Sequence, residues 1–241
     1  MVNLVIIQAR MGSSRLPGKV LMKLEGKTIL EHIIDFLKFS KFTDKIIVAT
    51  STNYEDDQIE KLCNRLEITC FRGSSKDVLN RYYECAKLYK GDIVVRITGD
   101  NPLIDPTIVD EAIELCKNKN LDYVSNMLHE TYPLGYLVEV MKFSILKKNN
   151  DELNHPLTRE HVTHHIRQNS FLYNFEEIFA PKNFHRSKWR LTIDTKNDFK
   201  LMKIIFQHLY KPDDFISYYD VVNFLDANLD LLKINQTTEK N

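Results

Sequence analysis

A short polar stretch near the start of the chain, "QARMGSSRLPGK", concentrates groups that bind phosphate. It begins at residue 8, directly after the apolar run "LVII", and contains the three cations Arg10, Arg15 and Lys19. Arginine offers phosphate two parallel hydrogen bonds, and Gly12 and Gly18 allow backbone N–H groups to curve around an anion. The alternative is an ordinary glycine and serine turn with solvated charges. Three cations directly after a buried strand favour an anion site that could hold a triphosphate.

The stretch differs from a P-loop in two ways. Five residues separate its two glycines where a P-loop has four, and valine follows Lys19 where a P-loop has the Ser or Thr that holds Mg²⁺. Any Mg²⁺ must therefore be held by carboxylates elsewhere. Asp100, in "RITGDNPLID", follows one predicted strand; Asp194, in "LTIDTKNDF", ends another, with Asp198 one helical turn further on. Carboxylates from two strands, completed by phosphate oxygens and water, are typical Mg²⁺ ligands. Taken singly, Asp100 also suits a turn and Asp194 a helix N-cap.

The overall composition limits the class of protein. Lysine plus arginine and aspartate plus glutamate each number 33, so the formal net charge is zero, which argues against a nucleic-acid partner. With 43% hydrophobic residues the 241-residue chain can bury a core. No apolar run approaches the roughly 18 residues of a membrane span, and the segment 2–9 is too short for a signal peptide.

The four cysteines show neither a C-x-x-C pair nor zinc-site spacing. They lie within apolar-periodic segments, so we expect reduced core thiols in a cytoplasmic protein. The cysteines are Cys63, Cys70, Cys85 and Cys116.

Alternating strands and helices are predicted to position these polar loops. The predicted strands are Leu4–Ala9, Lys45–Thr50, Ile68–Phe71, Asp92–Thr98 and Tyr123–Asn126. Between them, apolar residues recur at helical spacing in Thr28–Lys41, Asn53–Leu66, Lys76–Lys90 and Pro106–Lys119, the last with Asp105 as N-cap. This alternation predicts an α/β fold with a doubly wound, parallel sheet whose site lies at the carboxyl ends of the strands.

After about residue 127 the regular alternation of predicted strands and helices ends. We expect an excursion at about 128–188 within a single domain of residues 1–241. "YPLGYLVEVMKF" predicts a strand after a turn, and "NHPLTREHVTHHIRQ" predicts a capped, polar helix. "FLYNFEE" and "WRLTIDT" predict two further strands. Helices at Lys196–Tyr210 and from about Ser217 to Leu232 close the chain, before a polar tail, "NQTTEKN", that we expect to be frayed.

Several blocks together resemble the SpsF-like cytidylyltransferases of spore-coat polysaccharide biosynthesis, relatives of the CMP-Kdo and CMP-acylneuraminate synthetases. The blocks are "IIQARMGSSRLPGKVL", "ATSTNYEDDQIEKLC", "FRGSSKDVLNRYYECAK", "VVRITGDNPLIDP", "DYVSN", "REHVTHHI" and "LTIDTKNDF", in the expected order from residue 6 to about 200. The resemblance implies a nucleotide-diphospho-sugar transferase fold, Rossmann-like and of GT-A type, a three-layer sandwich with a mixed, mostly parallel sheet.

The resemblance also implies an activity: transfer of CMP from CTP to a sugar acid or related acceptor, with release of pyrophosphate and with Mg²⁺, for surface glycan biosynthesis. On the matching positions, it implies catalytic roles for Arg15, Lys19 and Asp100, and a metal site at Asp100 and Asp194. The nucleotide-binding positions that it implies are Ala9, Arg10, Gly12, Ser13, Ser14, Arg15, Lys19, Ser74, Asp77 and Arg81.

The acceptor region departs from the family, which usually has "YPDGLDVEV" where this chain reads "YPLGYLVEV". Two acidic positions have become Leu134 and Leu137, which indicates an altered acceptor pocket or, alternatively, drift in a surface turn or hydrophobic packing at a dimer interface. Relatives use the excursion for dimer contacts near the acceptor, so a homodimer is expected. The acceptor-binding positions expected are Leu134, Gly135, Tyr136, Glu139, Arg159, Glu160 and His161.

Other interpretations remain open at this stage. His161 and His165 are four apart on the predicted helix, but the motif is not H-E-x-x-H, which argues against zinc. A non-sugar phosphate acceptor is an alternative within the same class. A glycosyltransferase of this fold would typically carry D-x-D, which "TGDNP" lacks, and a nucleotide-binding module without activity is the third possibility. The choice of cytosine over the other bases rests on the resemblance alone.

Overall fold

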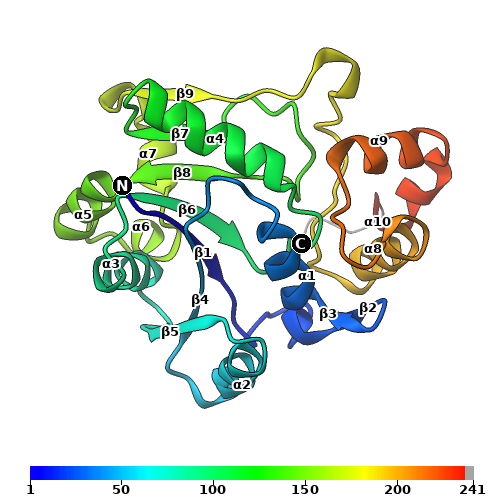
Figure 1. Cartoon of the computed structure of the whole chain (residues 1–241), viewed down its shortest axis with the longest axis horizontal. Helices are drawn as coiled ribbons and strands as arrows, with labels where there is room; N and C mark the ends of the chain where they lie inside the picture. Colours follow the sequence, from blue (N-terminus) through cyan, green and yellow to red (C-terminus); the bar gives the residue numbers. More distant parts are fainter. Residues whose placement is uncertain (237–241) are drawn as a thin grey trace.

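One seven-stranded sheet crosses the middle of the molecule in the computed structural model, which describes residues 1–236 (Figure 1). β1 lies between β4 and β6 and is parallel to both, whereas β8 runs antiparallel to β6 and β7. The sheet is therefore mixed and mostly parallel, as expected. In spatial order the strands are β5 (Thr69–Gly73), β4 (Lys45–Ser51), β1 (Asn3–Gln8), β6 (Ile93–Thr98), β8 (Glu139–Lys142), β7 (Tyr123–Ser125) and β9 (Phe175–Glu177).

Both faces of the sheet are covered by helices, because the central strands are apolar on both sides. Val5 and Ile7 of β1 face one core, and Leu4 and Ile6 face the other. The first core includes side chains of α1 (Ile29–Leu37), α2 (Asp57–Arg65), α4 (Pro106–Asn118), α8 (Lys196–Leu209) and α9 (Tyr218–Asp226). The second includes side chains of α3 (Val78–Leu88), α5 (Phe143–Glu152) and α7 (His164–Gln168), and α6 (Pro156–Glu160) lies beside α3. The result is the expected three-layer sandwich.

The helices begin where their capping residues predict. Thr28 and Glu31 form a reciprocal capping box at the start of α1. Asp105 caps α4, with Pro106 at the first helical position. A two-stranded hairpin of β2 (Lys23–Leu24) and β3 (Lys27–Thr28) precedes α1. None of the described helices combines the length and the apolar composition that a bilayer crossing requires.

Two expectations for the second half of the chain are wrong. The polar helix predicted from "NHPLTREHVTHHIRQ" is two short helices, α6 and α7, because the chain leaves helical geometry at His161 and turns Val162 into the second core. The strand predicted from "WRLTIDT" is an extended segment with a single bridge between Leu134 and Arg190. The Leu191 N–H donates to the Leu134 carbonyl, and the Ile193 N–H donates to the Asp100 carbonyl. Because these acceptors belong to two different loops, no β-ladder forms.

The C-terminal helical region is less regular than the sequence predicts. The last predicted helix is α9 followed by a 3₁₀ turn at Leu229–Leu232 and a short helix, α10 (Lys233–Gln236). Asn228, with a non-helical backbone, separates α9 from that turn. The frayed tail that we expected lies, from residue 237 on, outside the described residues.

Candidate active site

The cationic loop leaves β1 at the carboxyl edge of the sheet and closes on the backbone of Met11. The N–H groups of Ser13 and Gly18 both donate to the Met11 carbonyl, each at 2.9 Å. Gly18 has φ of +69°, a left-handed conformation that glycine adopts without strain, and it opens the 3₁₀ turn Lys19–Leu21. The side chains of Ser14 and Arg15 are exposed on the outside of this loop.

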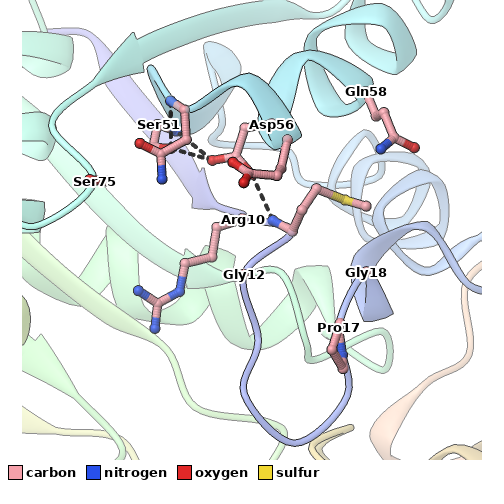
Figure 2. Close-up of a pocket in the computed structure, with 11 residues that line it drawn as sticks. Arg10, Gly12, Pro17, Gly18, Ser51, Asp56, Gln58 and Ser75 are labelled. Carbon is pink, nitrogen blue, oxygen red and sulfur yellow. Dashed lines mark hydrogen bonds between the residues drawn. The ribbon is translucent and has the colours of Figure 1, made fainter.

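A cavity of about 530 Å³ lies between the loop and the start of α2, in the size range of sites for nucleotides (Figure 2). Arg10, Gly12 and Gly18 line it from the loop. Ser51, at the end of β4, and Asp56, at the start of α2, line the opposite side. The cavity therefore lies at the carboxyl ends of the strands, where ligands bind in open α/β sheets.

Lys19 joins the two aspartates that we expected to bind metal. Its Nζ donates to Asp100 Oδ2 at 2.8 Å and to Asp194 Oδ1 at 2.9 Å. A third bond, of 2.7 Å, goes to the carbonyl of Ile193. The lysine side chain is only 9% exposed, so one nearly buried ammonium group holds both carboxylates together. The structure thus brings together two segments 94 residues apart in the sequence, Asp100 and Asp194.

Two arginines add to the positive charge around Asp194. Arg15 Nη2 lies 3.0 Å from Asp194 Oδ2, and Arg190 pairs with the same oxygen. Burial by itself raises the pKa of Asp194, but the hydrogen bond and charge of Lys19, with Arg190 and Arg15, outweigh it and hold the pKa below its ordinary value. Asp198 instead completes the capping box of α8 and pairs with Arg190.

The two carboxylates match the way that proteins hold Mg²⁺ together with a nucleotide. Mg²⁺ is usually bound by one or two carboxylates plus substrate phosphates, and not by an all-protein cage. No group of three or more His, Cys, Asp or Glu side chains within residues 1–236 could hold a metal alone. Asp100 and Asp194 therefore fit a metal ion that arrives with phosphate oxygens.

A smaller chamber, of about 90 Å³, joins residues expected in two different subsites. Ala9, Arg10 and Arg81 were expected at the nucleotide, and Glu160 and His161 at the acceptor; all five line it, with Gln8 and Val78. Arg81 is 2% exposed, and its Nη1 donates to the Ser74 carbonyl at 2.8 Å. Burial lowers the pKa of Arg81. Within the described residues, Arg81 Nε and Gln8 Oε1 are buried and have no hydrogen-bond partner.

Arg159 and Asp77 form an ion pair with each other. Arg159 Nε donates to Asp77 Oδ1 at 2.8 Å and its Nη2 to Oδ2, while Nη1 donates to the Asn150 carbonyl. Asp77 also caps α3 by accepting from the backbone N–H of Asn80. These two residues, expected at the acceptor and at the nucleotide, fasten α6 to the start of α3.

Three residues expected at the acceptor are buried in this structure. Tyr136 is fully buried, with its ring edge against Tyr218. Glu139 is buried in an ion pair with Arg96 and accepts from the Tyr123 hydroxyl. Neither side chain is available to a substrate.

The third of these buried residues, Gly135, packs against the backbone of Leu191. A Cβ atom on Gly135 would lie 2.3 Å from the Leu191 carbonyl oxygen, so this glycine permits a close approach of two chain segments. Leu134 beside it is 39% exposed and stays available to a ligand.

Several residues of the large cavity were missed from the sequence, among them Ser51 and Asp56. Asp56 is 2% exposed and accepts hydrogen bonds from Met11 N and from Ser51. Asp56 stands in the run "YEDDQ", and nothing in the sequence distinguishes it from its neighbour Asp57, a half-buried partner of Arg72. Only its contacts separate the two.

The remaining expectations concern histidine and cysteine. His161 and His165 lie in different short segments, so their predicted alignment on one helix face is wrong. The four cysteines form no disulfide; Cys63, Cys85 and Cys116 are buried, as expected for core thiols, and Cys70 is half-buried.

A sandwich of this topology, with a cationic loop beside paired aspartates at the carboxyl edge of its sheet, defines a nucleotidyltransferase of the nucleotide-diphospho-sugar transferase fold. The sequence profile of the cytidylyltransferases matches residues 4–220. The chain therefore belongs to the cytidylyltransferase family, in its SpsF-like branch, and is a CTP-dependent nucleotidyltransferase.

Similar proteins cover between 73% and 99% of the chain. The spore coat polysaccharide biosynthesis protein SpsF of Bacillus subtilis is 34% identical over 94% of this chain and 95% of its own length. A 3-deoxy-manno-octulosonate cytidylyltransferase of Chlamydia trachomatis is 28% identical over 73% of this chain and 68% of its own. A solved cytidylyltransferase structure from Leptospira borgpetersenii superposes with a TM-score of 0.93 at 34% identity, covering 99% of both chains.

Proposed function

We propose that this protein transfers CMP from CTP to a sugar acid, releasing pyrophosphate, in a step of surface glycan biosynthesis. The cluster of Lys19, Asp100 and Asp194 beside the cationic loop and the 530 Å³ cavity is the observation that carries the proposal. The acceptor class follows the relative named for 3-deoxy-manno-octulosonate, and the glycan role follows the relative named for spore coat polysaccharide.

In this reaction the protein itself needs to form or break few covalent bonds. An acceptor oxygen forms a bond to the α-phosphorus while the bond to the leaving pyrophosphate breaks, so alignment and charge stabilisation are the main tasks. Arg10, which lines both cavities, can bind the triphosphate from the side of the sheet. Arg15, exposed on the loop, can bind it from outside and carry charge on the departing pyrophosphate.

Lys19 must exchange partners for its expected catalytic role. An ammonium group has three donors, and all three are used by Asp100, Asp194 and the Ile193 carbonyl. It can donate to a phosphate oxygen only after it releases one of them. We infer that the arriving nucleotide draws Lys19 away from the aspartates.

Asp100 and Asp194 are the residues that would hold Mg²⁺ when Lys19 leaves them. Bound there, Mg²⁺ would neutralise charge on the phosphate oxygens of the nucleotide. Before that, Lys19 keeps the carboxylates close together and offsets their mutual repulsion. The carboxylate pair thereby stays arranged for a divalent cation.

The acceptor lies, in this proposal, near Glu160, His161 and Leu134. Glu160 and His161 line the small chamber next to two arginines, Arg10 and Arg81, and this positive surrounding suits a carboxylate. Leu134 adds exposed apolar surface where relatives have an acid. A sugar acid with a less polar substituent on that side is the acceptor that these residues favour.

A homodimer is part of the proposal. Phe171 and Leu172 in the excursion are 81% and 60% exposed, and Leu157 on α6 is 49% exposed. Exposed large apolar side chains of this kind are common at subunit contacts. Light scattering on the purified protein tests this, and a monomeric mass at micromolar concentration would remove the dimer from the proposal.

Pyrophosphate release is the test of the activity. The purified protein is incubated with CTP or UTP and with 3-deoxy-manno-octulosonate, an acylneuraminate or a sugar phosphate, each with and without Mg²⁺. We expect release only with CTP, a sugar acid and Mg²⁺ together, and a CMP conjugate in the mass spectrum. Release with the sugar phosphate and not with the acids would overturn the acceptor class. Release without Mg²⁺ would overturn the metal assignment.

A further inference from the structure

Asp56 occupies an unusual position for a residue at the start of a helix. It is the last residue of the 3₁₀ turn Tyr54–Asp56, which runs directly into α2, and its side chain makes no capping hydrogen bond to that helix. An aspartate at an extended N-cap would accept from the helix's own first N–H groups. Here the carboxylate turns the other way, toward the loop that carries Arg10 and Gly12 (Figure 2).

Both carboxylate oxygens of Asp56 accept from backbone N–H groups of the site. Oδ1 accepts from Met11 N at 2.7 Å, and Oδ2 accepts from Ser51 N at 3.2 Å and from the Ser51 hydroxyl. Met11 lies in the cationic loop and Ser51 ends β4, so one buried side chain connects the loop to the sheet. The Ser51 hydroxyl in turn accepts from Asn53 N at 3.1 Å.

Met11 is the residue on which the loop closes. Its carbonyl accepts from Ser13 N and Gly18 N, the two ends of the turn. Its N–H has only Asp56 as partner among the described residues. A carboxylate that holds Met11 N therefore sets the position of the whole closed loop relative to the cavity.

We propose that Asp56 is a positioning residue that holds the phosphate-binding loop in its nucleotide-ready shape. It does not touch the phosphates; it acts through Met11 and Ser51. Ordering the loop before CTP arrives lowers the cost of binding, because the backbone that carries Arg10 is already fixed and loses less conformational entropy. The inference rests on CTP binding and not on the identity of the acceptor.

Asp56→Asn is a sharp test because asparagine cannot replace the carboxylate here. Each oxygen of Asp56 faces a backbone N–H, so either orientation of the amide places its NH₂ group against a donor. Asp57→Asn is the matched control: it removes a charge from the same helix end. Its partner Arg72 keeps a bond to Glu60. Ser51→Ala removes one of the three bonds to Asp56, together with the bond from Asn53 N, and leaves both N–H contacts of Asp56.

CTP affinity is measured by calorimetry without acceptor, and the loop is followed by the rate of trypsin cleavage after Arg10 and Arg15. We expect Asp56→Asn to weaken CTP binding by about 10- to 100-fold, the loss of a charge-assisted bond, and to speed cleavage. With a working acceptor, KM for CTP should rise more than kcat falls. Ser51→Ala should lie between Asp56→Asn and the control.

The outcomes separate this inference from the proposed function. If Asp56→Asn binds CTP and resists trypsin like Asp57→Asn, the positioning role is overturned. If it fails to fold, Ser51→Ala decides: unchanged CTP affinity and cleavage in that variant overturn the role. If the wild-type chain binds no CTP, the proposed function fails, and the trypsin comparison still decides whether Asp56 holds the loop.

Discussion

Lys19 Nζ lies 2.8 Å from Asp100 Oδ2 and 2.9 Å from Asp194 Oδ1, so a single ammonium group bridges carboxylates from two distant segments. This relationship changes how each residue is understood. Lysine in the loop was expected to contact phosphate, and the aspartates to contact metal. In the structure the lysine and the two aspartates are one another's partners. Substitutions of Asp100 and of Lys19 distinguish their role in this ion-pair cluster from their role in catalysis.

Asp100→Asn should abolish turnover and leave the fold intact. The amide removes one charge from the expected metal site, and losses of a charge-stabilising group in such sites reach about 100-fold or more in kcat. Pyrophosphate release and thermal unfolding measure the two effects. Asp230→Asn, at an exposed aspartate whose only ion pair within residues 1–236 is with Lys233, is the control and should be neutral in both. An Asp100→Asn enzyme that unfolds where the wild type is folded would mark Asp100 as structural.

Lys19→Met should destabilise the protein and make it more responsive to Mg²⁺. Without the ammonium group Asp100 loses its ion pair and faces Asp194, which keeps its ion pairs with Arg15 and Arg190, and this costs about 1–3 kcal/mol at this degree of exposure. Mg²⁺ should restore part of that stability, so its thermal shift should be larger in Lys19→Met than in the wild type. A Mg²⁺ titration of the melting temperature measures this. Equal shifts in both proteins, or the same shift when Asp100→Asn is added, would contradict a metal site at these carboxylates.

Gly135→Ala should disturb the active site from a distance. Gly135 has φ of +123°, and an added Cβ would lie 2.3 Å from the Leu191 carbonyl oxygen. The segment that leads to Asp194 must then move, and we expect a loss of about 2 kcal/mol in the free energy of unfolding together with lower kcat. Urea unfolding and pyrophosphate release measure the pair. A variant with normal stability and only an altered acceptor KM would restore Gly135 to the acceptor site.

Glu139 should contribute stability that disappears in acid. Burial alone raises the pKa of this carboxyl, but the charge of Arg96 and hydrogen bonds from Thr163 and Tyr123 outweigh it, so the pKa is lowered from 4.5. Because the folded-state pKa lies below the unfolded one, the contribution is complete above about pH 4.5 and is lost as pH falls through the folded-state value.

Glu139→Gln should therefore be less stable than the wild type at pH 7, and the difference should shrink below about pH 4.5. Urea unfolding across this range measures the free energies. Parallel curves for the two proteins would contradict the ion pair. An unchanged stability with a raised acceptor KM would favour the acceptor role that the sequence suggested.

Much of the fold follows from local pattern. The apolar run before Gln8, the Asp105 and Pro106 helix start, and the alternation of strands and helices up to Ser125 are all local signals, and the structure agrees with them. The cationic loop is local too, because its charges and glycines are adjacent in sequence. These features depend on backbone propensity and on which face of an element is apolar, and both can be read from the local sequence.

The pairing of the functional side chains depends on tertiary structure. Lys19 meets Asp194 only because the extended segment after Trp189 passes between Leu134 and Asp100, where pattern predicted a strand. Asp56 and Asp57 are the same residue type at adjacent positions, and the direction of each side chain decides that one holds the loop and the other pairs with Arg72. The sequence by itself determined the sandwich, the loop and the family. Which donor each carboxylate meets was decided by long-range packing, because a hydrogen bond depends on distance and direction that no local pattern records.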